Sequence, residues 1–141
     1  VRGLELEPAE AAVARFVSST LGSVHTPTGD AIEVDVSLEA APAVLYDALV
    51  LPDGAEAVDA LRADGHTMEF IKDQYRHCKP ILALGASEQL LQACDINTTL
   101  PNGQADAGVL VGADPGAVAD AFVDAIAKHR HFARETDPPR V

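Results

Sequence analysis

Two short apolar runs, separated by about thirty residues at 52–80, organise the middle of the chain. The first, residues 45–51, is broken only by one aspartate, and the turn-forming Pro52-Asp53-Gly54 follows it directly. The second, residues 81–84, is too short for a helix and lies between a proline and a glycine. A hairpin needs only a few connecting residues, so the long separation predicts parallel strands joined by a helical crossover. Because such continuously apolar strands have both faces covered by helices, the pattern predicts an α/β core.

Helical spacing of apolar positions predicts two helices in the crossover and a third after the second strand. Residues 55–65 and 67–77 form the crossover helices, with Gly65 as the C-cap of the first. Phe70, Ile71 and Tyr75 are expected to face inward on the second. The third helix ends near Cys94-Asp95.

A fourth, longer helix is predicted from Pro115 to about Glu135, with Asp114 as its N-cap. A loop at 97–104 and a last short strand at 107–111 precede it. Its apolar stripe, at helical spacing, consists of Val118, Phe122, Ala125, Ile126 and His129.

The region before the first run has a different period. Residues 32–37 alternate between apolar and polar side chains, which predicts a half-exposed strand at a sheet edge or in a small antiparallel flap. The alternation of strands and helices elsewhere is typical of a doubly wound, mostly parallel sheet with helices on both faces. We expect one such domain over residues 1–141, with an extended tail from Asp137.

Composition excludes several classes of partner. A formal net charge of −12 disfavours nucleic acid and anionic membranes, because phosphate binding needs clustered Lys and Arg. No apolar run has the length of a membrane span and no signal peptide is visible, so we expect a cytoplasmic protein. Two cysteines, Cys78 and Cys94, make no disulfide framework, and both are expected to be buried and reduced at helix ends.

Three segments carry a family resemblance: YDALVLPDG (46–54), FIKDQYRHCKPILALG (70–85) and AKHRHFAR (127–134). They resemble the C-terminal domain of large-subunit haem catalases. That domain is similar in turn to the flavodoxin-like DJ-1/PfpI and class I glutamine amidotransferase families. The resemblance extends from residues 13–24 to residues 125–135, which is most of the chain.

The resemblance implies more sheet than the N-terminal residues supply. Local propensity slightly favours a helix at residues 13–18, whereas the resemblance places a strand there, and we expect the strand. A flavodoxin-like domain also opens with a central strand and a helix, which the first twelve residues do not provide. Either the domain is truncated, or residues are missing between Gly3 and Pro8. We favour the gap, because a parallel sheet without its central strand would leave backbone groups unpaired.

The resemblance also indicates where chemistry would lie. The DJ-1/PfpI and amidotransferase relatives carry a nucleophilic cysteine on a tight turn between a strand and a helix. Here that position falls on Leu84, or on Gly85 with a shift of one residue, and neither is a nucleophile. Ser87 is nearby, but its surroundings lack the second glycine of a G-x-S-x-G elbow and favour a helix N-cap. The acidic partner of the relatives falls in the missing region. We therefore expect no catalytic residue, only a vestigial elbow of Leu84, Gly85 and Ser87.

Cofactor sites are not expected in this chain. His129 and His131 are two apart on the predicted helix and would point to different faces, and His77 fits a helix end better than a metal site. There is no dinucleotide or P-loop motif. Tyr46 and Tyr75 are expected to be packing residues. The resemblance places haem in another domain of the parent enzyme.

The functional expectation follows from the resemblance. It implies a non-catalytic accessory domain of a large-subunit catalase, a homotetramer that disproportionates hydrogen peroxide on haem and acts in oxidative stress. The domain would contribute stability, assembly or peroxide access. The alternatives are a stand-alone DJ-1/PfpI-like chaperone or hydrolase, and a ligand-binding flavodoxin-like module. Arg130, Phe132 and Arg134 are the residues expected to dock on the catalase core of the same polypeptide.

Overall fold

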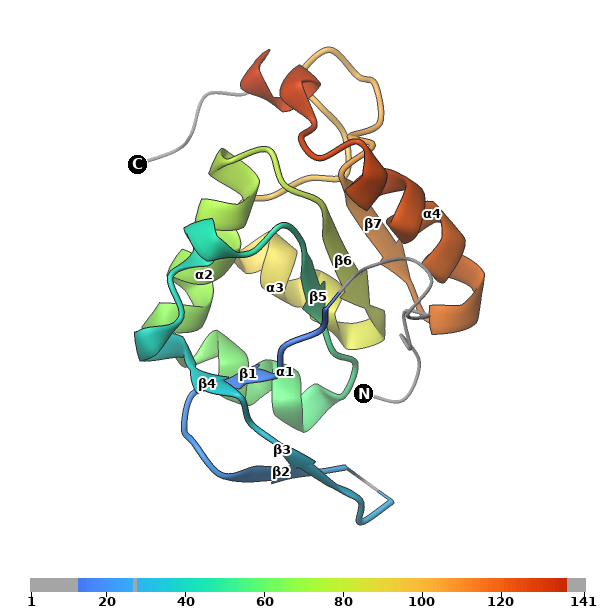
Figure 1. Cartoon of the computed structure of the whole chain (residues 1–141). Coiled ribbons are helices and arrows are strands. Elements are labelled where there is room, and N and C mark those ends of the chain that lie inside the picture. The colour runs from blue at the N-terminus through green and yellow to red at the C-terminus, as the bar shows by residue number, and fades with distance from the viewer. Residues whose placement is uncertain (1–12, 27, 137–141) are drawn as a thin grey trace.

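Three parallel strands form the centre of the molecule, a computed structural model that describes residues 13–26 and 28–136 (Figure 1). They are β5 (Leu49–Leu51), β6 (Ile81–Leu84) and β7 (Val109–Gly112), hydrogen-bonded in the order β5-β6-β7. Both pairings are parallel, as the long crossover predicted. The predicted α/β class with helices on both faces is confirmed. The proposed gap between Gly3 and Pro8, and the tail from Asp137, lie outside the described residues.

One face of the sheet is covered by three helices: α1 (Ala55–Arg62), α2 (Gly65–Arg76) and α3 (Glu88–Ala93). Alternate strand side chains point toward these helices, because successive residues of a strand face opposite sides. The main hydrophobic core lies in this layer. Its buried members are Leu51, Val58, Ile71, Ile81, Ala83, Leu90, Leu91, Cys94, Ile96 and Val109.

The other face is covered by α4 (Pro115–Ala127). Leu82 and Leu84 of the central strand point to this side and pack with Phe122 of α4. Each such fully buried side chain stabilises the fold by about 1.5–3 kcal/mol. None of the helices in the described residues is long and apolar enough to cross a membrane.

A smaller part of the fold precedes the sheet. β1 (Val17–Ser18) runs parallel to β4 (Val36–Ser37), and β2 (Ser23–His25) runs antiparallel to β3 (Ala31–Glu33). The β2–β3 ribbon projects from the body of the domain (Figure 1). An antiparallel flap is therefore present, but the single strand predicted over residues 32–37 is split into β3 and β4, which pair with different strands. The strand expected at residues 13–18 is reduced to the two residues of β1.

The first central strand is shorter than predicted. Residue 45 ends the 3₁₀ turn η3 (Ala43–Leu45), and residues 46–48 are irregular. The ammonium group of Lys79 donates hydrogen bonds to backbone carbonyl oxygens of residues 44 and 46. Its Nζ donates to Val44 O at 2.9 Å and to Tyr46 O at 2.5 Å. These bonds hold residues 44 and 46 in the turn before the sheet, and β5 begins at Leu49. A second 3₁₀ turn, η2 (Leu38–Ala40), lies just before this segment.

Gly65 was expected to end the first crossover helix but instead begins the second. Helix α1 ends at Arg62 with Ala63 as its C-cap. Asp64 is the N-cap of α2, and its carboxylate accepts a hydrogen bond from His66 N at 2.8 Å. The side-chain cap starts the new helix at residue 65, so the glycine is not needed as a stop.

The prediction of one continuous helix to Glu135 is wrong. Helix α4 ends at Ala127, and His129 adopts a left-handed backbone conformation, with φ of 61°. His129 N donates to Ile126 O at 2.9 Å, and His131 N then donates to Cys78 O at 2.7 Å. This second bond turns the chain across the start of β6 and into the 3₁₀ turn η5 (Phe132–Thr136). His129 is consequently exposed and not part of the inward stripe.

Candidate functional site

The carboxyl ends of β5 and β6 lie at the edge of the sheet where open α/β folds place their sites. Strand β6 leads into the 3₁₀ turn η4 (Gly85–Ser87) and then α3. Gly85 has φ of 53°, in the left-handed region, so it is the residue that makes the sharp turn. Leu84 still belongs to the strand, and its side chain is buried against α4. Of Leu84 and Gly85, it is Gly85 that has the backbone conformation of a sharp strand-to-helix turn.

Asp53 fills the space in front of this turn. Its Oδ1 accepts two backbone hydrogen bonds, from Gly54 N at 2.7 Å and from Ala86 N at 2.9 Å. The bond from Ala86, followed by that from Gly54, holds the pKa of the Asp53 carboxyl below its ordinary value of 3.8. A Cβ atom added at Gly85 would overlap Cγ, Oδ1 and Oδ2 of Asp53. The carboxylate of Asp53, in the loop after β5, therefore occupies the space that a side chain at residue 85, in the turn after β6, would need.

Ser87 is placed as expected but bonded differently. It occupies the N-cap position of α3, yet its side chain makes no cap hydrogen bond. Its hydroxyl donates instead to the carbonyl oxygen of Pro52, and the residue is fully buried. A buried, engaged hydroxyl cannot reach a substrate, so Ser87 ties the elbow to the end of β5.

Sequence reasoning missed Asp53, which was interpreted only as a turn residue. The signal was its position: Asp53 is the second residue after β5, and Gly85 directly follows the neighbouring strand β6. Parallel strands bring these two positions to the same edge of a sheet. The pairing of β5 with β6, which places Leu51 beside Ala83, brings Asp53 and Gly85 together.

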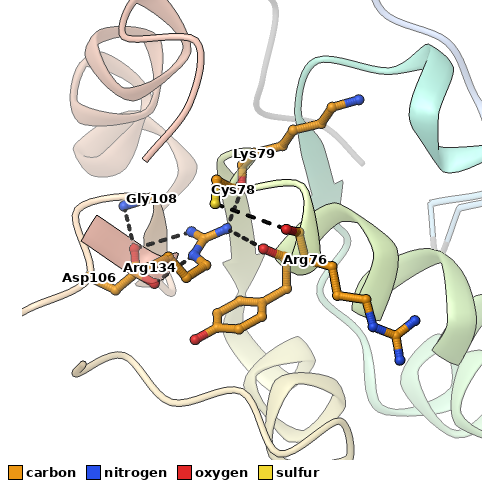
Figure 2. Close-up of polar contacts among 7 residues, drawn as sticks. Arg76, Cys78, Lys79, Asp106, Gly108 and Arg134 are labelled. Carbon is orange, nitrogen blue, oxygen red and sulfur yellow. Dashed lines mark hydrogen bonds and ion pairs between the residues drawn. The ribbon is translucent and has the colours of Figure 1, made fainter. Parts of the chain in front are cut away.

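The opposite, amino-terminal end of the sheet holds a buried charged cluster (Figure 2). Arg134 donates through Nε to Asp106 Oδ2 at 2.8 Å and through Nη2 to Asp106 Oδ1 at 3.1 Å. Its Nη1 donates to Tyr75 O at 3.2 Å and to Lys79 O at 2.9 Å. The guanidinium carbon also lies 4.5 Å from the ring centre of Tyr75. This cluster fastens the C-terminal segment to α2 and to the start of β6.

The cluster corrects one expected docking residue. Arg134 is only 2% exposed and is committed to partners inside the domain, so it is not available to another domain. Phe132, in contrast, is 61% exposed and Arg130 is also exposed. Lys79 is buried nearby, where desolvation lowers the pKa of its ammonium group against the opposing effect of Asp47.

The histidines and tyrosines considered for metal or haem chemistry lie in different surroundings. His131 is buried, with Nε2 3.1 Å from Ala125 O, and His129 lies on the surface. Tyr46 packs on Phe70 with ring centres 5.6 Å apart, and the ring of Tyr75 lies 4.5 Å from the guanidinium carbon of Arg134. Among the described residues, no three His, Cys, Asp or Glu side chains could together hold a metal ion.

Neither Cys78 nor Cys94 forms a disulfide, and both are buried, as predicted. Burial raises the pKa of the Cys94 thiol, which keeps it protonated at neutral pH. Its Sγ lies 3.8 Å from Met68 O.

Comparison with known proteins gives the family. The family model for the C-terminal domain found in long catalases matches residues 6–136. The chain belongs to this family. The catalase HPII of Mycobacterium avium is 36% identical over 124 residues, which are 82% of this chain and 18% of that protein. The catalase HPII of Pseudomonas putida is 31% identical over 120 residues, 85% of this chain and 15% of that protein.

The fold of this catalase C-terminal domain is also found outside catalases. A ThiJ/PfpI domain protein from Brachyspira murdochii superposes with a TM-score of 0.72, covering 86% of this chain and 83% of that one. Its sequence identity is 18%, so the likeness establishes the ThiJ/PfpI-type fold alone. The chain spans less than a fifth of the length of the two catalases above.

Proposed function

We propose that this chain is a non-catalytic accessory domain of a long haem catalase. The observation that supports it is the elbow: the turn residue is Gly85, and Asp53 occupies the space where a nucleophile would project. An acyl-transfer or thiol enzyme needs a nucleophile there with a base beside it, and neither is present among the described residues. The decomposition of hydrogen peroxide, the haem and the homotetramer belong in this proposal to the rest of the parent enzyme.

The domain's contribution is to the stability of the parent, through docking on the catalase core of the same polypeptide. Phe132 is the apolar anchor of the docking surface, and Arg130 lies two residues before it in sequence. The segment that carries both, residues 128–136, lies at the end of the molecule opposite the β2–β3 flap (Figure 1). An aromatic side chain and an arginine are the usual carriers of interface energy. The exposed part of the Phe132 ring is apolar surface that a partner could cover.

The test replaces Phe132 and Arg130 with Ala in the full-length parent and in this domain alone. The expected result is an unchanged melting temperature of the domain and a lowered temperature of heat inactivation for the parent. Leu21→Ala is the matched control, because Leu21 is 69% exposed but lies toward the flap. Equal losses in domain and parent would show that these residues pack only within the domain. A loss from Leu21→Ala as large as that from Phe132→Ala would mean that the docking surface is not specific.

A second test concerns catalysis by the domain itself. The isolated chain, incubated with haem and freed of excess, should show neither a Soret band nor peroxide turnover, because both tyrosines are engaged in packing. Turnover that depends on haem binding to this chain would overturn the assignment.

A further inference from the structure

The two donors that hold Asp53 have the arrangement of an oxyanion hole. In a nucleophile elbow, one donor is the backbone N–H of the residue after the nucleophile, and a second comes from a neighbouring loop. Here Ala86 directly follows the turn residue Gly85, and Gly54 belongs to the turn after β5. Both N–H groups point at one atom, Oδ1 of Asp53, at 2.9 and 2.7 Å.

The turn residue is matched to this occupant. Gly85 has the left-handed φ that an elbow requires, and any side chain there would collide with the whole Asp53 carboxyl group. Asp53 is exposed, so a side chain at residue 85 could be accommodated only if the carboxylate swung away and gave up its two backbone hydrogen bonds. The glycine at position 85, which offers no nucleophile, leaves the space that the Asp53 carboxylate fills.

We propose that Asp53 is an internal occupant of the oxyanion position of this elbow, and that its carboxylate keeps the site closed to both a nucleophile and an anionic substrate. In this proposal the site does not only lack a nucleophile; a charged side chain also occupies its two N–H donors. An anionic oxygen, as in a carboxylate or a tetrahedral oxyanion, is the ligand class that the two donors would accept in its place. Replacing Gly85 by a nucleophile is then insufficient to restore reactivity, because Asp53 must be removed as well.

The first experiment is a double-mutant cycle on the whole chain, read as melting temperature. Gly85→Ala combines left-handed strain with the overlap on Asp53. Gly103→Ala is its matched control, because Gly103 has φ of 84° but nothing within 4 Å of an added Cβ. We expect Gly85→Ala to lower the melting temperature much more than Gly103→Ala does.

Asp53→Gly separates the two causes. In that background the loss from Gly85→Ala should shrink to the size of the Gly103→Ala loss, whereas the Gly103→Ala loss should not change. If Gly85→Ala alone does not fold, recovery of the folded state in the double variant supports the proposal. An unchanged loss, or a double variant that also fails to fold, would overturn it, because strain at Gly85 would then account for everything.

The second experiment measures the reactivity of a thiol introduced by Gly85→Cys, with iodoacetamide as the probe. The sulfur forms a bond to carbon, iodide leaves, and the thiol proton passes to the buffer. Peptide mass spectrometry separates this site from Cys78 and Cys94, which serve as buried internal controls. Leu84→Cys is a further control, since that side chain faces the core.

The expected result is labelling at least roughly tenfold faster in the Asp53→Gly background than with Asp53 present. A neighbouring carboxylate raises the pKa of a thiol, whereas two freed N–H donors lower it, and one pKa unit changes the thiolate fraction about tenfold. Asp53→Asn should leave labelling slow, because the amide still fills the space. Equal rates with Asp53 and with glycine would overturn the proposal. None of these outcomes depends on the identity of the parent enzyme.

Discussion

Asp106 and Arg134 face each other inside the domain through two hydrogen bonds, of 2.8 and 3.1 Å, with side chains that are 2% and 1% exposed. Arg134 comes from the C-terminal 3₁₀ turn and Asp106 from the loop before β7, 28 residues earlier. Gly108 lies so close that a Cβ there would overlap both Arg134 and His131. The two charges are thus enclosed by backbone on several sides, and the pair fixes the C-terminal segment on the domain.

Breaking this pair should destabilise the domain strongly. Arg134→Met leaves the Asp106 carboxylate buried and unpaired, and we expect a loss of about 3–5 kcal/mol in the free energy of unfolding, measured by urea denaturation. The matched control is Arg76→Met, which removes the partly exposed ion pair of 2.9 Å with Asp73 and should cost less than about 1 kcal/mol. Similar losses in the two variants would contradict the assignment of Arg134 as a buried structural residue.

The Asp53 bridge predicts a specific dependence on acid. The pKa of Asp53 is lower in the folded than in the unfolded chain, so the unfolded chain binds more protons in the interval between the two values. The stabilisation from Asp53 is therefore complete above its ordinary pKa of 3.8 and is lost as the pH falls through the lowered value. The urea midpoints of wild type and Asp53→Asn should differ at neutral pH and converge in strong acid. A difference that stays constant down to strong acid would show that the carboxylate charge is not involved.

The two cysteines should be unreactive in the folded protein. Both are buried, and the raised pKa of Cys94 adds to the protection. Titration with a disulfide reagent should label neither quickly in native protein and both after denaturation in urea. Fast labelling of either thiol in the native state would indicate an activated cysteine and would favour an enzyme function.

The break after α4 can be tested by substitutions with opposite expected signs. Because His129 has a positive φ, His129→Gly should be neutral or stabilise the domain by up to about 1 kcal/mol, whereas His129→Val should destabilise it. If the helix continued through residue 129, the order would reverse, since glycine is the poorer helix former by several tenths of a kcal/mol. Thermal unfolding of the two variants distinguishes the structures, because residue 129 is exposed and makes no core contact.

Sequence alone determined the class of the fold and the positions of most elements. The run at 81–84 became β6 with the predicted bounds, and the capping pair Asp114-Pro115 begins α4 as predicted. These features depend on local signals: apolar runs, prolines, glycines and side-chain caps. Three of the quoted segments also carried enough specific residues to indicate the catalase C-terminal family.

Only the tertiary structure decided the rest, because each remaining feature depends on a contact between distant residues. Lys79 holds the turn before β5 by donating to carbonyls more than thirty residues away, and Cys78 O holds the chain after α4 by accepting a bond from His131. The sequence suggested that Arg134 is a surface cation, whereas the structure buries it in an ion pair with Asp106. At the elbow, sequence showed that Gly85 lacks a nucleophile, but not that Asp53 fills its place. A local pattern carries no information on which loop will meet which, and only the parallel pairing of β5 with β6 brings that carboxylate to that glycine.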